Sequence, residues 1–83
     1  MKLIALTPEK EIFNGDIKSV KVPGTSGQFE ILKDHAPIVA ALSEGEVRII
    51  SDDGNKTNFN IEKGFVEVLN NEVSLLIQAL KED

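Results

Sequence analysis

The sequence contains no cysteine, tryptophan or tyrosine, and it has one histidine. Without cysteine the chain can form neither disulfide bonds nor thiolate metal sites, and one histidine is too few for the usual zinc ligand sets. The apolar segment before Pro8 is much shorter than a signal-peptide core or a membrane span. We therefore expect a cytoplasmic protein that has no metal or cofactor and does not insert directly into a membrane.

Basic charge is also scarce, since nine Lys and Arg residues stand against 14 Asp and Glu residues and give a net charge of −5. The basic residues are not clustered, so a phosphate-rich partner would be repelled and we expect no nucleic-acid binding. A length of 83 residues gives room for one domain, residues 1–83. A domain of this size buries only about 60 to 65 per cent of its unfolded surface, so a partner can form part of its structure.

Short segments rich in strand-forming residues recur along the whole chain, separated by turn signals about every 8 to 12 residues. This spacing is typical of a sandwich or a barrel. We predict an all-β fold, a small antiparallel β-sandwich of about eight to ten short strands. The expected strands are residues 2–7, 11–13, 17–22, 28–31, 38–42, 46–51, 56–61, 65–69 and 73–77.

Two local signals refine this prediction near the N-terminus. The dipeptide Asn14-Gly15 favours a tight type I′ turn, so segment 17–22 is expected to fold back on segment 11–13. Within 17–22 the apolar positions change parity, which predicts a β-bulge near Lys18 or Ser19.

The C-terminal segment fits two patterns. Its apolar residues match both a strand and the helical template, so periodicity alone permits a helix over residues 72–81. We favour the strand, because Asn70-Asn71 is a poor helix interior and a good hairpin turn. Residues 81–83 are expected to fray.

No group of residues points to catalysis or metal binding, and we predict no catalytic residue and no metal ligand. His35 has no second histidine, cysteine or serine partner at catalytic spacing, so we expect a structural or contact role. Segment 52–55 lacks the alternating oxygens and the closing Glu of a calcium loop, and a hairpin turn explains it. Segment 24–27 leads into a strand without the Lys-Ser or Lys-Thr of a phosphate loop, so it is a weak nucleotide site.

A longer segment resembles a known family. Residues 24–37, from Gly24-Thr25-Ser26-Gly27 to His35-Ala36-Pro37, are similar to the β-sandwich domain of the epsilon subunit of F-type ATP synthase, as are Thr7-Pro8-Glu9 and Ile12-Phe13-Asn14-Gly15 upstream. The resemblance implies a non-catalytic rotor subunit of the central stalk, which binds the gamma subunit and the c-ring and helps couple proton or sodium flow to ATP synthesis. It also implies a monomer as a free subunit, and a peripheral place at the cytoplasmic face of the bacterial inner membrane.

The same resemblance implies the contact residues. Many bacterial relatives continue into a two-helix arm that inhibits ATP hydrolysis; the sequence stops at Asp83, where that arm would begin, so no inhibitory role is expected. The ring-facing loop lacks the acidic residues that relatives often carry, so we expect its contact to be hydrogen-bonded more than ionic. The implied gamma-subunit contacts are Thr7, His35, Pro37, Val39, Ala40 and Leu42, and the implied c-ring contacts are Thr25, Ser26 and Gln28.

Two other functional classes remain open. A stand-alone binding module for oligosaccharide or single-stranded nucleic acid would need exposed aromatic rings beside basic residues, and two exposed phenylalanines on one face would favour it. A hydrolase with a carboxylate pair would need a deep pocket and two facing acids. The candidate rings are Phe13, Phe29, Phe59 and Phe65, and the candidate acids are Glu30, Asp34, Glu44 and Glu46.

Overall fold

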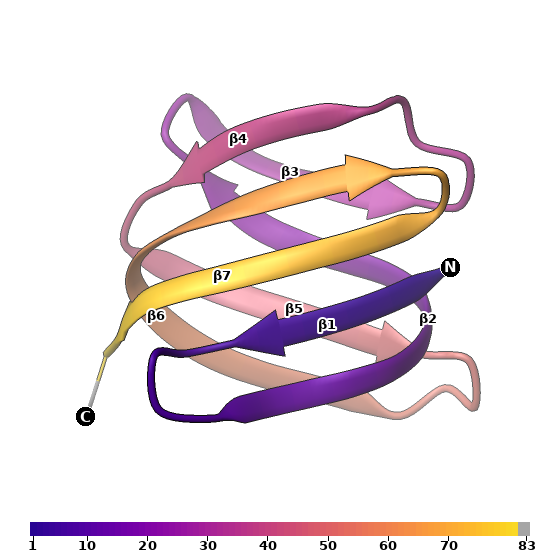
Figure 1. Cartoon of the computed structure of the whole chain (residues 1–83), viewed down its shortest axis with the longest axis horizontal. Helices are drawn as coiled ribbons and strands as arrows, with labels where there is room; N and C mark the ends of the chain where they lie inside the picture. Colours follow the sequence, from indigo (N-terminus) through magenta and orange to yellow (C-terminus); the bar gives the residue numbers. More distant parts are fainter. Residues whose placement is uncertain (82–83) are drawn as a thin grey trace.

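The computed structural model describes residues 1–81, and this part of the chain contains seven strands and no helix (Figure 1). The C-terminal segment is a strand, which confirms the preferred interpretation of its pattern. Of the residues expected to fray, Glu82 and Asp83 lie outside the described residues. The strands are β1 (Lys2–Leu6), β2 (Glu11–Gly24), β3 (Gly27–Leu32), β4 (Ile38–Leu42), β5 (Gly45–Ser51), β6 (Lys56–Leu69) and β7 (Glu72–Leu80).

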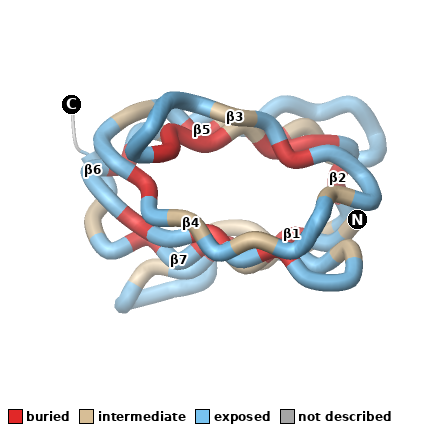
Figure 2. The backbone as a smooth tube through the Cα atoms, turned by 90° about the horizontal axis from the view of Figure 1, so that it is seen from above, coloured by how far each residue is buried: buried red, intermediate tan, exposed pale blue. Residues whose placement is uncertain are grey.

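The strands form two facing layers with the buried residues between them (Figure 2). The first layer contains β4, the C-terminal half of β6, β7, β1 and the N-terminal half of β2. The second layer contains β3, the C-terminal half of β2, β5 and the N-terminal half of β6. The predicted all-β sandwich is confirmed, and β2 and β6 join its layers because each strand takes part in both.

Two details of the predicted architecture are wrong. The pairing of β1 with β7 is parallel, with Lys2 opposite Glu72, whereas all other strand pairs are antiparallel. The described chain has seven strands rather than eight to ten, because segments 56–61 and 65–69 are parts of one strand, β6, and segments 11–13 and 17–22 are parts of β2.

The predicted turn at Asn14-Gly15 is therefore also wrong. Asn14 pairs with Ile4 and Gly15 with Leu3, so the backbone stays extended through the dipeptide. Gly15 is not among the glycines with positive φ, which a type I′ turn would require. The pairing with β1 overrides the local preference for a turn, as tertiary context commonly does in strands.

The predicted bulge in β2 is confirmed. The register against β5 shifts between Ile17 and Ser19, so Lys18 is the extra residue. The bulge allows Ile17 and Val20, which have opposite parity, both to be buried. Because a bulge bends a strand and increases its twist, it also explains how β2 passes from one layer to the other.

Strand β6 has a similar irregularity, where its register against β7 shifts twice between Ile61 and Gly64. Gly64 is buried, and a Cβ atom at this position would lie 2.5 Å from the backbone oxygen of Leu76. Only glycine therefore allows β6 and β7 to approach this closely. The core between the layers consists mainly of Leu3, Ile17, Val20, Val22, Ile31, Val47, Ile49, Ile61, Val66, Leu75 and Ile77.

Candidate partner-binding face

The outer surface of the first layer carries a continuous row of apolar side chains. Strand pairing places Leu6 beside Leu76, Leu76 beside Phe65, and Phe65 beside Ala41. Leu6, Leu76 and Phe65 are 37%, 47% and 42% exposed. We call these four residues the apolar row. Large apolar patches are rarely left uncovered on soluble proteins and commonly mark interaction sites.

The next row on this surface adds a further exposed side chain. Val39 on β4 is 72% exposed and lies opposite Glu67 of β6, which pairs with Ser74 of β7. Along β4 the side chains alternate, so that Val39 and Ala41 are exposed, whereas Leu42 is buried. The apolar row and Val39 together extend across four strands.

The outer surface of the second layer is mainly polar. Its central row contains Glu30, Lys21, Arg48 and Asn58 on four neighbouring strands. Arg48 also lies 3.8 Å from a carboxylate oxygen of a glutamate two residues earlier on β5. Leu32, at the end of β3, is the exposed large hydrophobic residue of this layer's edge strand. The two faces of the sandwich thus differ in the partners that they suit.

The six implied gamma-subunit contacts do not all lie at the surface. Leu42 is 3% exposed and belongs to the core, and Ala40 packs against that core. The other four, Thr7, His35, Pro37 and Val39, are exposed or half-buried. Val39 on β4 is exposed. Thr7 lies in the β1–β2 loop, and His35 and Pro37 lie in the β3–β4 loop. These two loops lie at opposite ends of the first layer (Figure 1).

His35 and Thr7 are both held by local hydrogen bonds. The His35 amide donates to the Leu32 oxygen at 3.1 Å, and its Nδ1 lies 2.7 Å from the Ala36 oxygen. Since a carbonyl oxygen only accepts, Nδ1 carries the proton in this bond. The Thr7 amide donates to the Lys10 oxygen at 2.8 Å, and Thr7 Oγ1 accepts from the Lys10 amide at 3.1 Å.

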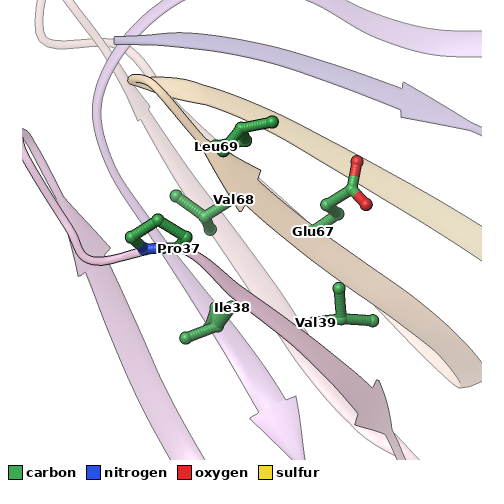
Figure 3. A pocket seen from close by; sticks show the side chains of 6 residues that line it. All are labelled: Pro37, Ile38, Val39, Glu67, Val68 and Leu69. Carbon is green, nitrogen blue, oxygen red and sulfur yellow. The ribbon is translucent and has the colours of Figure 1, made fainter.

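Each end of the apolar face contains a shallow pocket. One pocket, of about 270 Å³, is lined by residues of β4 and β6 and by Pro37. Figure 3 shows the hydrocarbon side chains of Pro37, Val39 and Leu69 around it, with the Glu67 carboxylate as the charged group. The other pocket lies beside Phe65 and Leu76, and its lining continues to Pro8 in the β1–β2 loop. Neither pocket contains the facing carboxylates that acid–base hydrolysis requires.

The three implied c-ring contacts are exposed at one end of the sandwich. Thr25 and Ser26 form the tip of the β2–β3 turn, and Gln28 follows at the start of β3. The Thr25 amide donates to the Ala41 oxygen at 3.2 Å, which fixes the turn against β4. Gly27 has a φ of 125°, a conformation that suits glycine. These residues therefore form a polar tip that adjoins the Ala41 end of the apolar row.

Phe65 is the phenylalanine with the largest exposure, and Phe13, Phe29 and Phe59 pack against the core. Within residues 1–81 there is no pair of exposed phenylalanines on one face, which is the arrangement that would favour the stacking module. The binding-module alternative therefore lacks its expected feature.

The candidate acids of the hydrolase alternative have separate neighbours. Glu44 Oε2 lies 2.8 Å from Lys81 Nζ, and Asp34 Oδ1 accepts a hydrogen bond of 2.9 Å from Asn71. In the described part of the chain no group of three or more His, Cys, Asp or Glu residues is arranged to hold a metal ion. Nor does that part of the chain provide a helix with the length and hydropathy needed to span a bilayer.

Sequence reasoning missed the three largest members of the apolar row. A signal for Phe65 was present, since in segment 65–69 both alternating sets of positions contain apolar residues. On β7, the run Leu75-Leu76-Ile77 also breaks the alternation expected of a strand with one wet face. Apolar residues on both faces of β6 and β7 predict that one face is covered by the core and the other by a binding partner.

Comparison with known proteins shows the family of this chain. Residues 1–82 match the family described as ATP synthase, Delta/Epsilon chain, beta-sandwich domain. The chain is 46% identical over 77 residues to the ATP synthase epsilon chain of Chlorobium limicola, an alignment that covers 93% of this chain and 88% of the relative. It is 43% identical over 79 residues to the epsilon chain of Protochlamydia amoebophila, covering 95% of this chain and 54% of that relative.

Solved structures share the fold. A chain of the Euglena gracilis mitochondrial ATP synthase matches with a TM-score of 0.81 at 19% identity, covering 90% of this chain and 48% of that one. A chain of the Tetrahymena thermophila mitochondrial ATP synthase central stalk and c-ring matches with a TM-score of 0.80 at 19% identity, covering 99% and 66%. The chain therefore spans most of the Chlorobium relative and about half of the Protochlamydia and Euglena chains.

Proposed function

Because this chain belongs to the family of ATP synthase delta/epsilon chain β-sandwich domains, we propose that it is a non-catalytic subunit of the central stalk. In this role it joins the gamma subunit to the c-ring of an F-type ATP synthase, and it helps couple proton or sodium flow to ATP synthesis. As part of this complex it lies peripherally at the cytoplasmic face of a bacterial inner membrane. The observation that carries the proposal is the contrast between the apolar row on one face and the polar surface of the other.

The apolar row and Val39 form the proposed gamma-binding surface, with Thr7, His35 and Pro37 at its ends. Covering these apolar side chains would remove on the order of 300 Å² of apolar surface from water, a gross gain of roughly 7 kcal/mol. The entropy of association offsets much of this gain. Ala40 and Leu42 act beneath the surface, because their side chains support β4 from the core.

The β2–β3 turn forms the proposed c-ring contact. Its exposed Thr25, Ser26 and Gln28 carry no charge and offer hydrogen-bonding groups. We therefore expect ring binding to weaken little as ionic strength rises, because screening acts on charged pairs. A close-packed sandwich is stiff, and β2 and β6 join its two layers. The domain is therefore suited to transmitting torque.

Cysteine cross-linking within the assembled complex tests this function, because the chain has no native cysteine. We expect His35→Cys and Val39→Cys to cross-link to the gamma subunit. Asn58→Cys is the matched control, since Asn58 is exposed on the polar face. Equal cross-linking from all three positions would remove the proposed gamma-binding surface, and no cross-link from any of them would remove the stalk role.

A further inference from the structure

Two reciprocal hydrogen bonds tie the β3–β4 loop to the β6–β7 turn. The Asp34 amide donates to Asn71 Oδ1 at 2.6 Å, and Asn71 Nδ2 donates to Asp34 Oδ1 at 2.9 Å. The two residues are 37 positions apart in the sequence. We call this pair the Asp34–Asn71 clasp. It joins two segments that the strand ladders alone do not connect.

The clasp coincides with unusual backbone geometry. Asp34, Asn70 and Asn71 have φ values of 65°, 51° and 61°, and they are the positive-φ residues other than glycine in the described chain. Asn and Asp tolerate this left-handed conformation better than other residues with a side chain, but it still costs conformational energy. Such strain persists where surrounding contacts hold it, and it is frequent at functional sites.

The clasp fixes the loop that leads to the proposed gamma-binding surface. His35, Ala36 and Pro37 lie between Asp34 and Ile38, which pairs with Val68 of β6. The loop is therefore held at the clasp and at the first pair of β4. The His35 amide adds a third point through its bond to the Leu32 oxygen.

We propose that Asp34 and Asn71 are positioning residues for gamma binding. This inference rests on the proposed function. The clasp holds His35 and Pro37 in place before the partner arrives, so that the pocket wall formed by Pro37 and Leu69 is already present (Figure 3). A preorganised loop loses less entropy on binding than a free one, so the clasp raises affinity without touching the partner.

Swapping the two side chains between the two positions tests the clasp. In Asn71→Asp the new carboxylate still accepts from the Asp34 amide, but it faces the Asp34 carboxylate and the second hydrogen bond is lost. In the double variant Asp34→Asn/Asn71→Asp the amide donor stands on the other side, so both bonds can form again. Asn and Asp both tolerate positive φ, so the backbone demand is unchanged. Asn70→Asp is the matched control, because it makes the same charge change at an exposed neighbour with positive φ.

Two measurements are made on the full chain: hydrogen exchange at the Asp34 and His35 amides, and affinity for ATP synthase complex depleted of this subunit. For Asn71→Asp we expect exchange at these amides about tenfold faster and binding about tenfold weaker, with both values restored to within about twofold in the double variant. Asn70→Asp should behave as the unmodified chain. A role confined to global stability would change the unfolding midpoint instead of these local values.

The clasp is overturned if hydrogen exchange at the Asp34 and His35 amides is unchanged in Asn71→Asp. It is also overturned if these amides exchange as fast in the double variant as in the single variant. Faster exchange with unaltered affinity would overturn the positioning role and leave the proposed function intact. If the unmodified chain does not bind the depleted complex, the proposed function fails. Amide hydrogen exchange alone then tests whether the clasp holds the loop. If Asn71→Asp does not fold, Asp34→Gly replaces it, because this change removes the carboxylate at a position where glycine suits the backbone. The same hydrogen-exchange and affinity measurements then apply to Asp34→Gly.

Discussion

Replacing Phe65 with threonine should cost about 2 kcal/mol in binding to the proposed gamma partner and about 1 kcal/mol in folding. The ring lies at the centre of the apolar row, between Leu76 and Ala41, and is 42% exposed. A phenylalanine has roughly 200 Å² of surface, so a partner would cover roughly 80 Å² of it here, which corresponds to about 2 kcal/mol. The dissociation constant should therefore rise about thirtyfold.

The cost to folding should be smaller, because threonine keeps a high strand propensity and the ring is not part of the buried core. Loss of the cross-strand contacts should cost about 1 kcal/mol, which lowers the melting temperature of a domain this size by about 4 to 8 °C. The variant should thus remain folded at the temperature of the binding assay.

Titration calorimetry with the depleted ATP synthase complex measures the affinity, and circular dichroism measures the melting temperature. Leu32→Thr is the matched control, since Leu32 is 52% exposed but lies on β3 in the second layer. It should bind as the unmodified chain does. If Phe65→Thr binds normally while Leu32→Thr binds weakly, the partner covers the other face and the reasoning from the apolar row is refuted.

Gly64→Ala should destabilise the fold by about 2 to 3 kcal/mol in urea unfolding, because its Cβ would lie 2.5 Å from the Leu76 oxygen. Gly15→Ala should change stability by less than about 0.5 kcal/mol, since its nearest contacts would be at 3.7 Å; equal losses would contradict this. Ser51→Ala should raise the pKa of Asp53, which the Ser51 hydroxyl holds below its ordinary value. A lowered pKa adds stability that is present at neutral pH and is lost as the pH falls through the Asp53 pKa. The variant should therefore be less stable than the unmodified chain only above that pH range. If carboxyl NMR titration gives Asp53 the same pKa in the variant and in the unmodified chain, the reasoning fails.

The fold class could be predicted because it depends on short-range patterns. Alternation in segment 28–31 places Phe29 and Ile31 on one side, and the structure buries Ile31 and packs Phe29 against the core. The bulge at Lys18 was also visible, since a change of apolar parity within one strand requires an extra residue. Both features depend on residues that are close together in the sequence.

The turn at Asn14-Gly15 was predicted wrongly because its outcome depends on a distant segment. The dipeptide favours a turn, but pairing of β2 with β1 makes an extended backbone more favourable. The apolar row was missed for a related reason. Its members come from four strands, and their alignment depends on registers that no single segment specifies.

Strand β4 shows why a contact segment inferred from a resemblance must be divided by strand periodicity. The resemblance selects Val39, Ala40 and Leu42 of this strand together, yet side chains of a strand point alternately to opposite sides. Val39 and Ala41 reach the outer surface, whereas Leu42 fills the core. A substitution at Leu42 would therefore reduce binding only by disturbing the fold, and a substitution at Val39 would act on the partner directly. Measuring both the affinity for the partner and the melting temperature of variants at these two positions distinguishes residues that support the proposed gamma-binding surface from residues that form it.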